Sequence, residues 1–215
     1  MFYTNRRSLS NIPTAPDTCG MRFKAVLVVI LIVAGAWALE AHARSGTQRT
    51  LSGVASQLAQ RPVHIRCQSF WANLLSINGH AGEVRFDANG TPADSAWLTR
   101  GTCGHLHAFI SSHGADLECL KAENWSTFVW NAPWDDCITK TEPVVQAVIV
   151  LAHESMHLRG IGSESDAQCG AERLATQTVE LLGGDPATGP LVEKLARAWN
   201  PFMPTEYQAP DCPQS

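Results

Sequence analysis

The sequence predicts an α+β domain in which a small β region precedes a helical core, with an export segment ahead of both. Three observations lead to this prediction. Short runs of alternating apolar and polar residues, broken by Asn-Gly turns, lie between residues 62 and 98 and indicate strands. Apolar residues at helical spacing fill most of the chain from residue 142 onward. An even set of cysteines follows residue 43, which is typical of an exported domain held by disulfides.

The first 43 residues are predicted to be an export segment. The apolar run 25–39 follows two basic residues and precedes an Ala-His-Ala site, so we expect a secretory signal that is cleaved after Ala43. The alternative is an uncleaved anchor with a membrane tether through residues 23–39, although the run is short beside the ~20 residues that a span needs. Met21 begins a complete signal by itself and is a candidate for the true start. Residues 44–215 would form a single domain that is secreted or otherwise extracytoplasmic.

Composition limits the partners that the chain would bind. The formal net charge of the whole chain is −4, and no cluster or stripe of Lys and Arg is visible. Nucleic acid is therefore not an expected partner. The length of 215 residues, with 45% hydrophobic residues, allows one domain with one core besides the export segment.

The first part of the domain mixes one helix with short strands. Residues 44–60 carry four apolar residues at helical spacing and predict an amphipathic helix. Residues 63–67 alternate, and residues 83–87 lie between two turn signals, so both predict strands in a hairpin or meander. A second helix is expected over residues 102–113, ending at Gly114.

The segment 117–141 carries Trp125, Trp130 and Trp134 among turn-forming residues. The simpler interpretation is an aromatic-packed loop closed by Cys119 and Cys137, and the functional one is an apolar wall of a substrate cleft. The remaining cysteines are Cys67, Cys103, Cys169 and Cys212, of which Cys212 could tie the tail to Cys169. Three disulfides are expected, but spacing alone does not assign every partner.

Three helices are predicted in the second half of the domain. The first covers residues 142–159, with Pro143 in its first turn and Gly160 after its end. The second begins near Ser163, which with Asp166 is close to a capping box, and continues to residue 182. The last covers residues 190–199 and is followed by a Pro-rich tail that we expect to be extended.

The first of these helices carries His153-Glu154-Ser155-Met156-His157, an H-E-x-x-H motif. At about 100° per residue, the two histidines lie on one face of the helix and about 6 Å apart along its axis, so both imidazoles can chelate one tetrahedral ion. Glu154 is then directed to the rim of the site, where it can act as a general base. A surface helix that carries two histidines by chance is the alternative. The other histidines of the domain are not expected to be ligands: His64, His80, His105, His107 and His113.

A catalytic zinc ion keeps three protein ligands and one open position, so a third ligand is needed. Glu164 is the leading candidate, because it follows a Gly-containing turn at the point where the chain folds back toward the first helix. An acidic residue in a first helical turn is also favoured without any metal. Asp166, Glu172 and Cys169 remain alternatives, although a disulfide is the expected state of Cys169.

The passage HESMHLRGIGSESDAQCGAER, with a glutamate in the helix after H-E-x-x-H, resembles the zincin metallopeptidases of the gluzincin type. It also resembles small exported, uncharacterised HExxH proteins of actinobacteria. The resemblance covers about residues 142–182, and Glu164 follows His157 sooner than in most gluzincins. It implies a zincin-like helical core, Zn²⁺ held by His153, His157 and Glu164, and Glu154 as the catalytic residue.

Two functions follow as expectations. The first is an exported zinc-dependent metallopeptidase that hydrolyses a protein or peptide substrate, with Tyr207 or Arg159 as candidate donors to the oxyanion. The second is a non-catalytic, metal-stabilised binding or envelope-associated domain on the same scaffold. The presence of Glu154 favours the first, because a purely structural metal site needs no base.

Overall fold

The structure, a computed structural model, describes residues 18–69, 81–122, 136–209 and 212. It is an α+β structure, as predicted, and divides into two compact units, residues 1–43 and 44–215. Helix α1 (Thr18–Ala59) accounts for the described part of the first unit, where the described apolar side chains between residues 26 and 32 are exposed. No helix in the described part of the chain is long and apolar enough to cross a membrane.

The second unit begins with the last turns of α1, which hold the first strand in place. Leu51, Val54, Ala55 and Leu58 are buried, as their helical spacing predicted. Strand β1 (His64–Cys67) buries alternate residues. Ser52 Oγ accepts a hydrogen bond of 2.9 Å from the Ile65 amide, so α1 satisfies a backbone donor at the edge of the sheet.

The sheet has three strands, and its middle strand is the last in sequence. Strand β2 (Gly82–Phe86) and strand β3 (Pro92–Leu98) form an antiparallel hairpin, whereas β1 pairs with β3 in parallel. The two predicted strands are confirmed, but they do not pair with each other: the hairpin within residues 62–98 joins β2 to β3, and a meander is wrong. β3 gave only a weak signal, since it starts at a proline and buries only Ala96 and Leu98. The hairpin turn places Gly90 at φ +76°, which glycine adopts without strain.

The second predicted helix is confirmed as α3 (Arg100–Ser112), which begins at an N-cap hydrogen bond from the Thr102 amide to Thr99. A short 3₁₀ helix, η1 (Ala115–Ala122), follows it. Most of the Trp-rich loop expected over residues 117–141 falls outside the described residues, including Trp125, Trp130 and Trp134, but its two ends, residues 117–122 and 136–141, are helical and not loop. The three disulfides join Cys67 to Cys103, Cys119 to Cys137, and Cys169 to Cys212, and the last two pairs are those that the sequence suggested.

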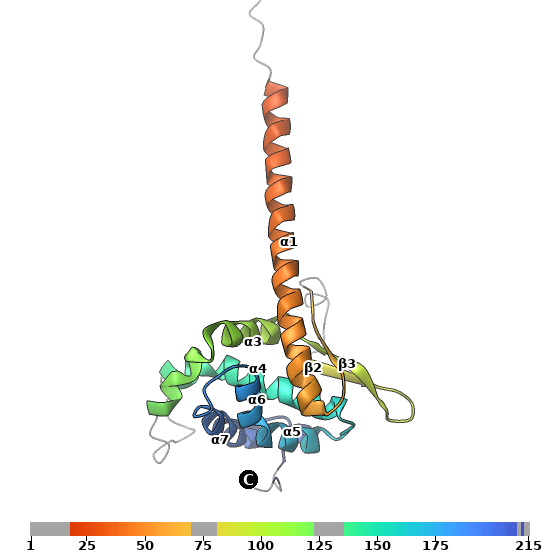
Figure 1. Cartoon of the computed structure of the whole chain (residues 1–215), viewed down its shortest axis with the longest axis vertical. Helices are drawn as coiled ribbons and strands as arrows, with labels where there is room; N and C mark the ends of the chain where they lie inside the picture. Colours follow the sequence, from red (N-terminus) through yellow and green to blue (C-terminus); the bar gives the residue numbers. More distant parts are fainter. Residues whose placement is uncertain (1–17, 70–80, 123–135, 210–211, 213–215) are drawn as a thin grey trace, which may run out of the picture. The chain divides into compact units, whose positions relative to one another are not determined.

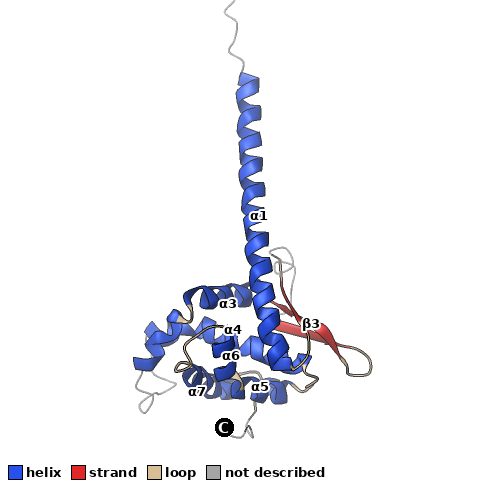
Figure 2. Ribbon diagram, viewed as in Figure 1, coloured by secondary structure: helices blue, strands red, loops and turns tan. Residues whose placement is uncertain are grey.

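Helix α4 (Asp136–Leu158) is the central element of the second unit. It packs against β2, β3, α3 and η1, and also against α5 (Glu164–Arg173), α6 (Ala175–Leu181) and α7 (Gly189–Trp199) (Figure 1). Helices dominate this unit and the strands lie together (Figure 2). A helix with neighbours on every side must be apolar on every side, which explains its unbroken run of Val, Ile, Leu and Ala.

Three details of the helices differ from prediction. α4 starts before residue 142, so Pro143 lies inside the helix and not in its first turn. Burial of Ile138 and Thr141 stabilises the turns before the proline and offsets the backbone hydrogen bond that proline lacks. The predicted helix 163–182 is interrupted at Leu174, which leaves helical geometry (ψ 1°) while the apolar periodicity continues into α6.

The tail after α7 is not extended as expected. It forms two 3₁₀ turns, η2 (Asn200–Phe202) and η3 (Thr205–Tyr207). Asn200 anchors both, because its amide group donates to the Tyr207 carbonyl and its Oδ1 accepts from the Ala209 amide. Its Nδ2 also donates to Glu172 Oε1 on α5, and the disulfide from Cys212 to Cys169 ties the end of the tail to the same helix.

Candidate metal centre

The candidate site lies at the C-terminal end of α4. His153, Glu154 and His157 are each no more than 6% exposed, although all three are polar. Buried polar groups carry a large free-energy cost unless they find partners. Their burial on one short stretch of helix therefore requires groups from the neighbouring elements to satisfy them.

The turn after α4 supplies one of these partners. Gly160 has φ +108°; its amide bonds to the His157 carbonyl, and the Ile161 amide bonds to the Met156 carbonyl. This is a Schellman motif, which ends the helix and reverses the chain. The reversal brings the Ile161 carbonyl within 2.7 Å of His157 Nδ1, so this carbonyl orients the imidazole.

The same turn returns the chain to the site at the start of α5. Ser163 is the N-cap of this helix and accepts a hydrogen bond from the Asp166 amide, as the capping pattern predicted. Glu164 is the first helical residue, and the N-terminal end of the helix favours its negative charge. Only a short connection separates Glu164 from His157. Because the chain reverses direction within it, this connection is long enough to bring the Glu164 side chain back to the histidine.

Three candidate ligand atoms converge between α4 and α5. His153 Nε2 lies 3.0 Å from His157 Nε2 and 2.9 Å from Glu164 Oε2. His157 Nε2 lies 3.2 Å from the same carboxylate oxygen. The three residues predicted as metal ligands therefore form one cluster, and they are the one such group of His, Cys, Asp and Glu in the described part of the chain.

The protonation of His157 bears on what the cluster can hold. Its Nδ1 faces a carbonyl oxygen at 2.7 Å, so we infer that Nδ1 carries the proton in the neutral ring. The lone pair of Nε2 then points at the carboxylate oxygen and at the other imidazole. Burial lowers the pKa of His153, and the neighbouring His157 lowers it further, against the opposing effect of Glu164. The three atoms thus converge in a buried place, an arrangement that a cation could hold together.

The spacing of the three atoms fits a zinc ion. Tetrahedral bonds of about 2.0–2.1 Å place ligand atoms roughly 3.4 Å apart. The observed separations of 2.9, 3.0 and 3.2 Å need only small side-chain movements to reach this value. Two imidazole nitrogens and one carboxylate oxygen are also a donor set that zinc accepts.

Glu154 lies beside the cluster and against strand β2. A Cβ atom added to Gly82 would lie 2.6 Å from Glu154 Cγ and 2.7 Å from Cδ, so the carboxylate occupies space that only glycine leaves free. Its Oε2 is buried and has no hydrogen-bond partner among the described residues. Burial raises the pKa of Glu154 to about 8, and the charges of Glu164 and Glu83 add to this effect.

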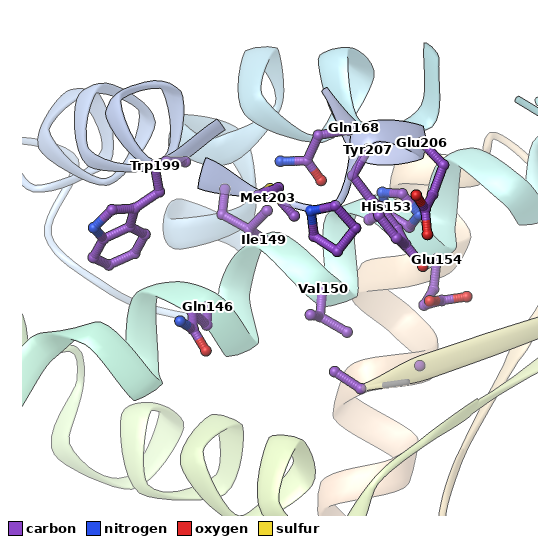
Figure 3. Close-up of a pocket in the computed structure, with 14 residues that line it drawn as sticks. Gln146, Ile149, Val150, His153, Glu154, Gln168, Trp199, Met203, Glu206 and Tyr207 are labelled. Atoms are coloured by element: carbon purple, nitrogen blue, oxygen red, sulfur yellow. The ribbon is translucent and has the colours of Figure 1, made fainter. Parts of the chain in front are cut away.

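A cavity of about 450 Å³ opens from this end of α4. His153, Glu154, Glu206 and Tyr207 lie at one end, and Gln146 and Trp199 lie at the other (Figure 3). Tyr207 lies near His153, with ring centroids 5.5 Å apart. Burial raises the pKa of Tyr207, and the nearby Glu164 and Glu154 raise it further, so its hydroxyl stays protonated at neutral pH.

The alternative ligands are not part of the cluster. Cys169 is in a disulfide, and Asp166 is exposed on α5. Glu172 is buried, where its Oε1 accepts hydrogen bonds from Gln168 and Asn200. Four of the histidines that were not expected to be ligands are exposed: His64, His105, His107 and His113. His107 hydrogen-bonds to Thr47, and His80 lies outside the described residues.

Of the two candidate oxyanion donors, Arg159 donates to Gln60 on the surface, whereas Tyr207 lines the cavity.

Sequence reasoning missed two residues that shape the site, Gly82 and Gln168. Gly82 lies just before the predicted strand 83–87, where the sequence gives no sign that another side chain needs the space. Gln168 follows Glu164 by one helical turn on α5, and this spacing was the only signal that it faces α4.

Comparison of the chain with protein-family models, with curated proteins and with solved structures gives no match.

Proposed function

We propose that His153, His157 and Glu164 bind one zinc ion and that the protein is a metal-dependent hydrolase. The observation that carries this proposal is the convergence of three candidate ligand atoms within 3.2 Å of one another. A carbonyl oxygen orients the His157 ring, and burial lowers the pKa of His153. More particularly, we assign it to exported zinc metallopeptidases of the gluzincin type, because a glutamate after H-E-x-x-H completes the ligand set.

The other residues of the site have roles that suit hydrolysis. A zinc ion in this position would act as a Lewis acid and lower the pKa of a water toward ~7. Burial raises the pKa of Glu154 to about 8, and the positive charge of a bound zinc ion would lower it again, so that the ionised carboxylate could accept a proton at the rim of the cluster and pass it to a departing amine. Tyr207 can donate its hydroxyl proton in a hydrogen bond to a developing oxyanion.

The three disulfides support an extracytoplasmic location, because such bonds persist in oxidising compartments. Secretion through a cleaved signal in residues 1–43 is part of this proposal.

A non-catalytic, metal-stabilised binding domain is the second candidate. The aromatic rings next to the two histidines favour it. Phe86 packs edge-on against His157 with ring centroids 5.8 Å apart, and Tyr207 lies 5.5 Å from His153. Rings in these positions limit the space around the ligands. A structural metal site tolerates this limit, whereas a catalytic site must keep one side of the metal open.

The test is to measure zinc and peptide cleavage in the purified, disulfide-bonded protein and in Glu154→Gln. We expect one zinc per chain in both proteins, and a loss of cleavage of about 10²–10⁴-fold in the variant. Glu180→Gln, a change of an exposed acid on α6, is the matched control and should retain both properties. Zinc in both proteins without cleavage by either would favour the binding domain, and absence of zinc would overturn both candidates.

A further inference from the structure

The cavity beside the metal centre follows one face of α4. Gln146, Ile149, Val150 and His153 line it, and their spacing places them along a single stripe of the helix. The stripe starts at the metal ligand and continues toward the N-terminal end of the helix. A group bound at the metal centre can therefore extend along α4 without leaving the cavity.

The opposite walls come from α7 and from the tail. Trp199 and Ala196 lie on α7, and Met203 and Pro204 lie on the tail. Ile149 and Met203 make the middle of the cavity apolar, and Trp199 lies at the end away from the metal centre (Figure 3). A volume of about 450 Å³ lies within the range of natural ligand sites and accommodates one large side chain with part of the adjoining backbone.

Acidic side chains line the cavity near the metal centre. Glu154 and Glu206 line it, and no Lys or Arg does so among the described residues. A carboxylate that entered the cavity would lose its hydration and meet the negative charge of Glu206, and the described residues offer no cationic side chain in the cavity to offset this cost.

We propose that the cavity selects a bulky apolar side chain next to the bond that is cleaved, and that it rejects an acidic side chain or a free terminal carboxylate there. This inference rests on the proposed function and deepens it. The enzyme would cut within peptide chains beside large apolar residues, and it would not remove single residues from a C-terminus.

Binding to the zinc-loaded, disulfide-bonded protein tests the selection without requiring cleavage. Three small hydroxamates, which bind zinc through the same group, would carry a benzyl, a methyl or a carboxymethyl side chain, and calorimetry would measure their affinities. We expect the benzyl compound to bind at least about tenfold more tightly than the methyl compound. The carboxymethyl compound should bind more weakly than the methyl compound.

Two variants connect the selection with named residues. Val150→Trp fills the apolar stripe, so it should remove the advantage of the benzyl compound while the methyl compound still binds, which shows that the metal site is intact. Glu206→Lys should improve the binding of the carboxymethyl compound by on the order of tenfold. Glu180→Lys, the same change outside the cavity, should not.

The outcomes separate this inference from the proposed function. Equal affinities of the zinc-loaded protein for all three compounds would overturn the proposed side-chain selection but would not contradict the proposed metal site. A clear benzyl preference without cleavage of any peptide would support the selection and contradict the peptidase. If peptides with Phe or Leu beside the scissile bond are cut and those with Asp or Glu are not, both are supported. Protein that binds no zinc would overturn both.

Discussion

At the scale of single residues, the position of Glu154 depends on a residue in another element. The side chain lies against Gly82 of β2, where any Cβ atom would approach Cγ and Cδ of the glutamate to less than 2.8 Å. Atoms do not approach so closely in packed interiors, so a larger residue at position 82 must displace the carboxylate. The carboxylate is therefore positioned by the sheet as well as by the helix that carries it.

We predict that Gly82→Ala reduces peptide cleavage while leaving zinc binding intact. The three atoms nearest to the added methyl group all belong to Glu154, so the carboxylate is the group that it displaces first. A misplacement of about 1 Å costs on the order of 10²-fold in rate. Zinc content and kcat are the measurements. Gly104→Ala is the control, because a Cβ atom there meets nothing within 4 Å. Unchanged cleavage by Gly82→Ala would show that Glu154 has room to move.

At the scale of elements, the tail is a wall of the cavity that is attached at two points. Asn200 holds its beginning through hydrogen bonds to Glu172, Tyr207 and Ala209. The disulfide between Cys169 and Cys212 holds its end. Both attachments lead to α5, the helix that also supplies Glu164. The position of the cavity wall is thus coupled to the position of a candidate metal ligand.

Replacing Cys169 and Cys212 by alanine should loosen the tail. The bond closes a separation of 43 residues, so its loss is expected to lower the free energy of unfolding by on the order of 3–4 kcal/mol. Hydrogen exchange of the Ala209 amide should become faster at the same time. Removal of the Cys119–Cys137 pair is the control, since it costs similar stability away from the tail. Equal protection of Ala209 in both variants would mean that Asn200 holds the tail alone.

At the scale of the whole molecule, a buried acid makes stability depend on pH. Glu172 is 2% exposed, and burial raises its pKa above the ordinary value, against the hydrogen bond from Gln168 and the charge of Arg197, which lower it. The folded state therefore binds this proton more tightly than the unfolded state. The stabilisation is complete below about pH 4.5, the ordinary value, and is lost as the pH rises through the pKa of the folded protein.

Glu172→Gln should therefore be more stable than the wild type at pH 7, with the difference vanishing below pH 4.5. The glutamine keeps an oxygen for Gln168 and Asn200 but does not ionise. One proton limits the change to about 1.4 kcal/mol per pH unit. Denaturant unfolding of both proteins across this range measures the difference. A variant that is less stable than the wild type at pH 7 would show that the charge of Glu172 contributes more than its burial costs.

Much of this architecture could be predicted because it follows from local patterns. The spacing of Leu51, Val54 and Leu58 predicted their burial, and Gly160 and Ser163 predicted where one helix ends and the next begins. β3 and the early start of α4 could not be predicted. Pro92 and Pro143 signal interruption locally, and only contacts with other elements offset that signal.

The candidate site was likewise predictable from the sequence only in part. The sequence by itself determined that His153 and His157 share a face of one helix, since 3.6 residues per turn allows no other arrangement. It also placed Glu164 just after a turn. Only the tertiary structure decided that the turn is tight enough to bring Glu164 to both imidazoles, that Gly82 makes room for Glu154, and that α7 and the tail enclose a cavity beside them. These features depend on contacts between residues far apart in the chain, and such contacts leave no periodic pattern in a single sequence.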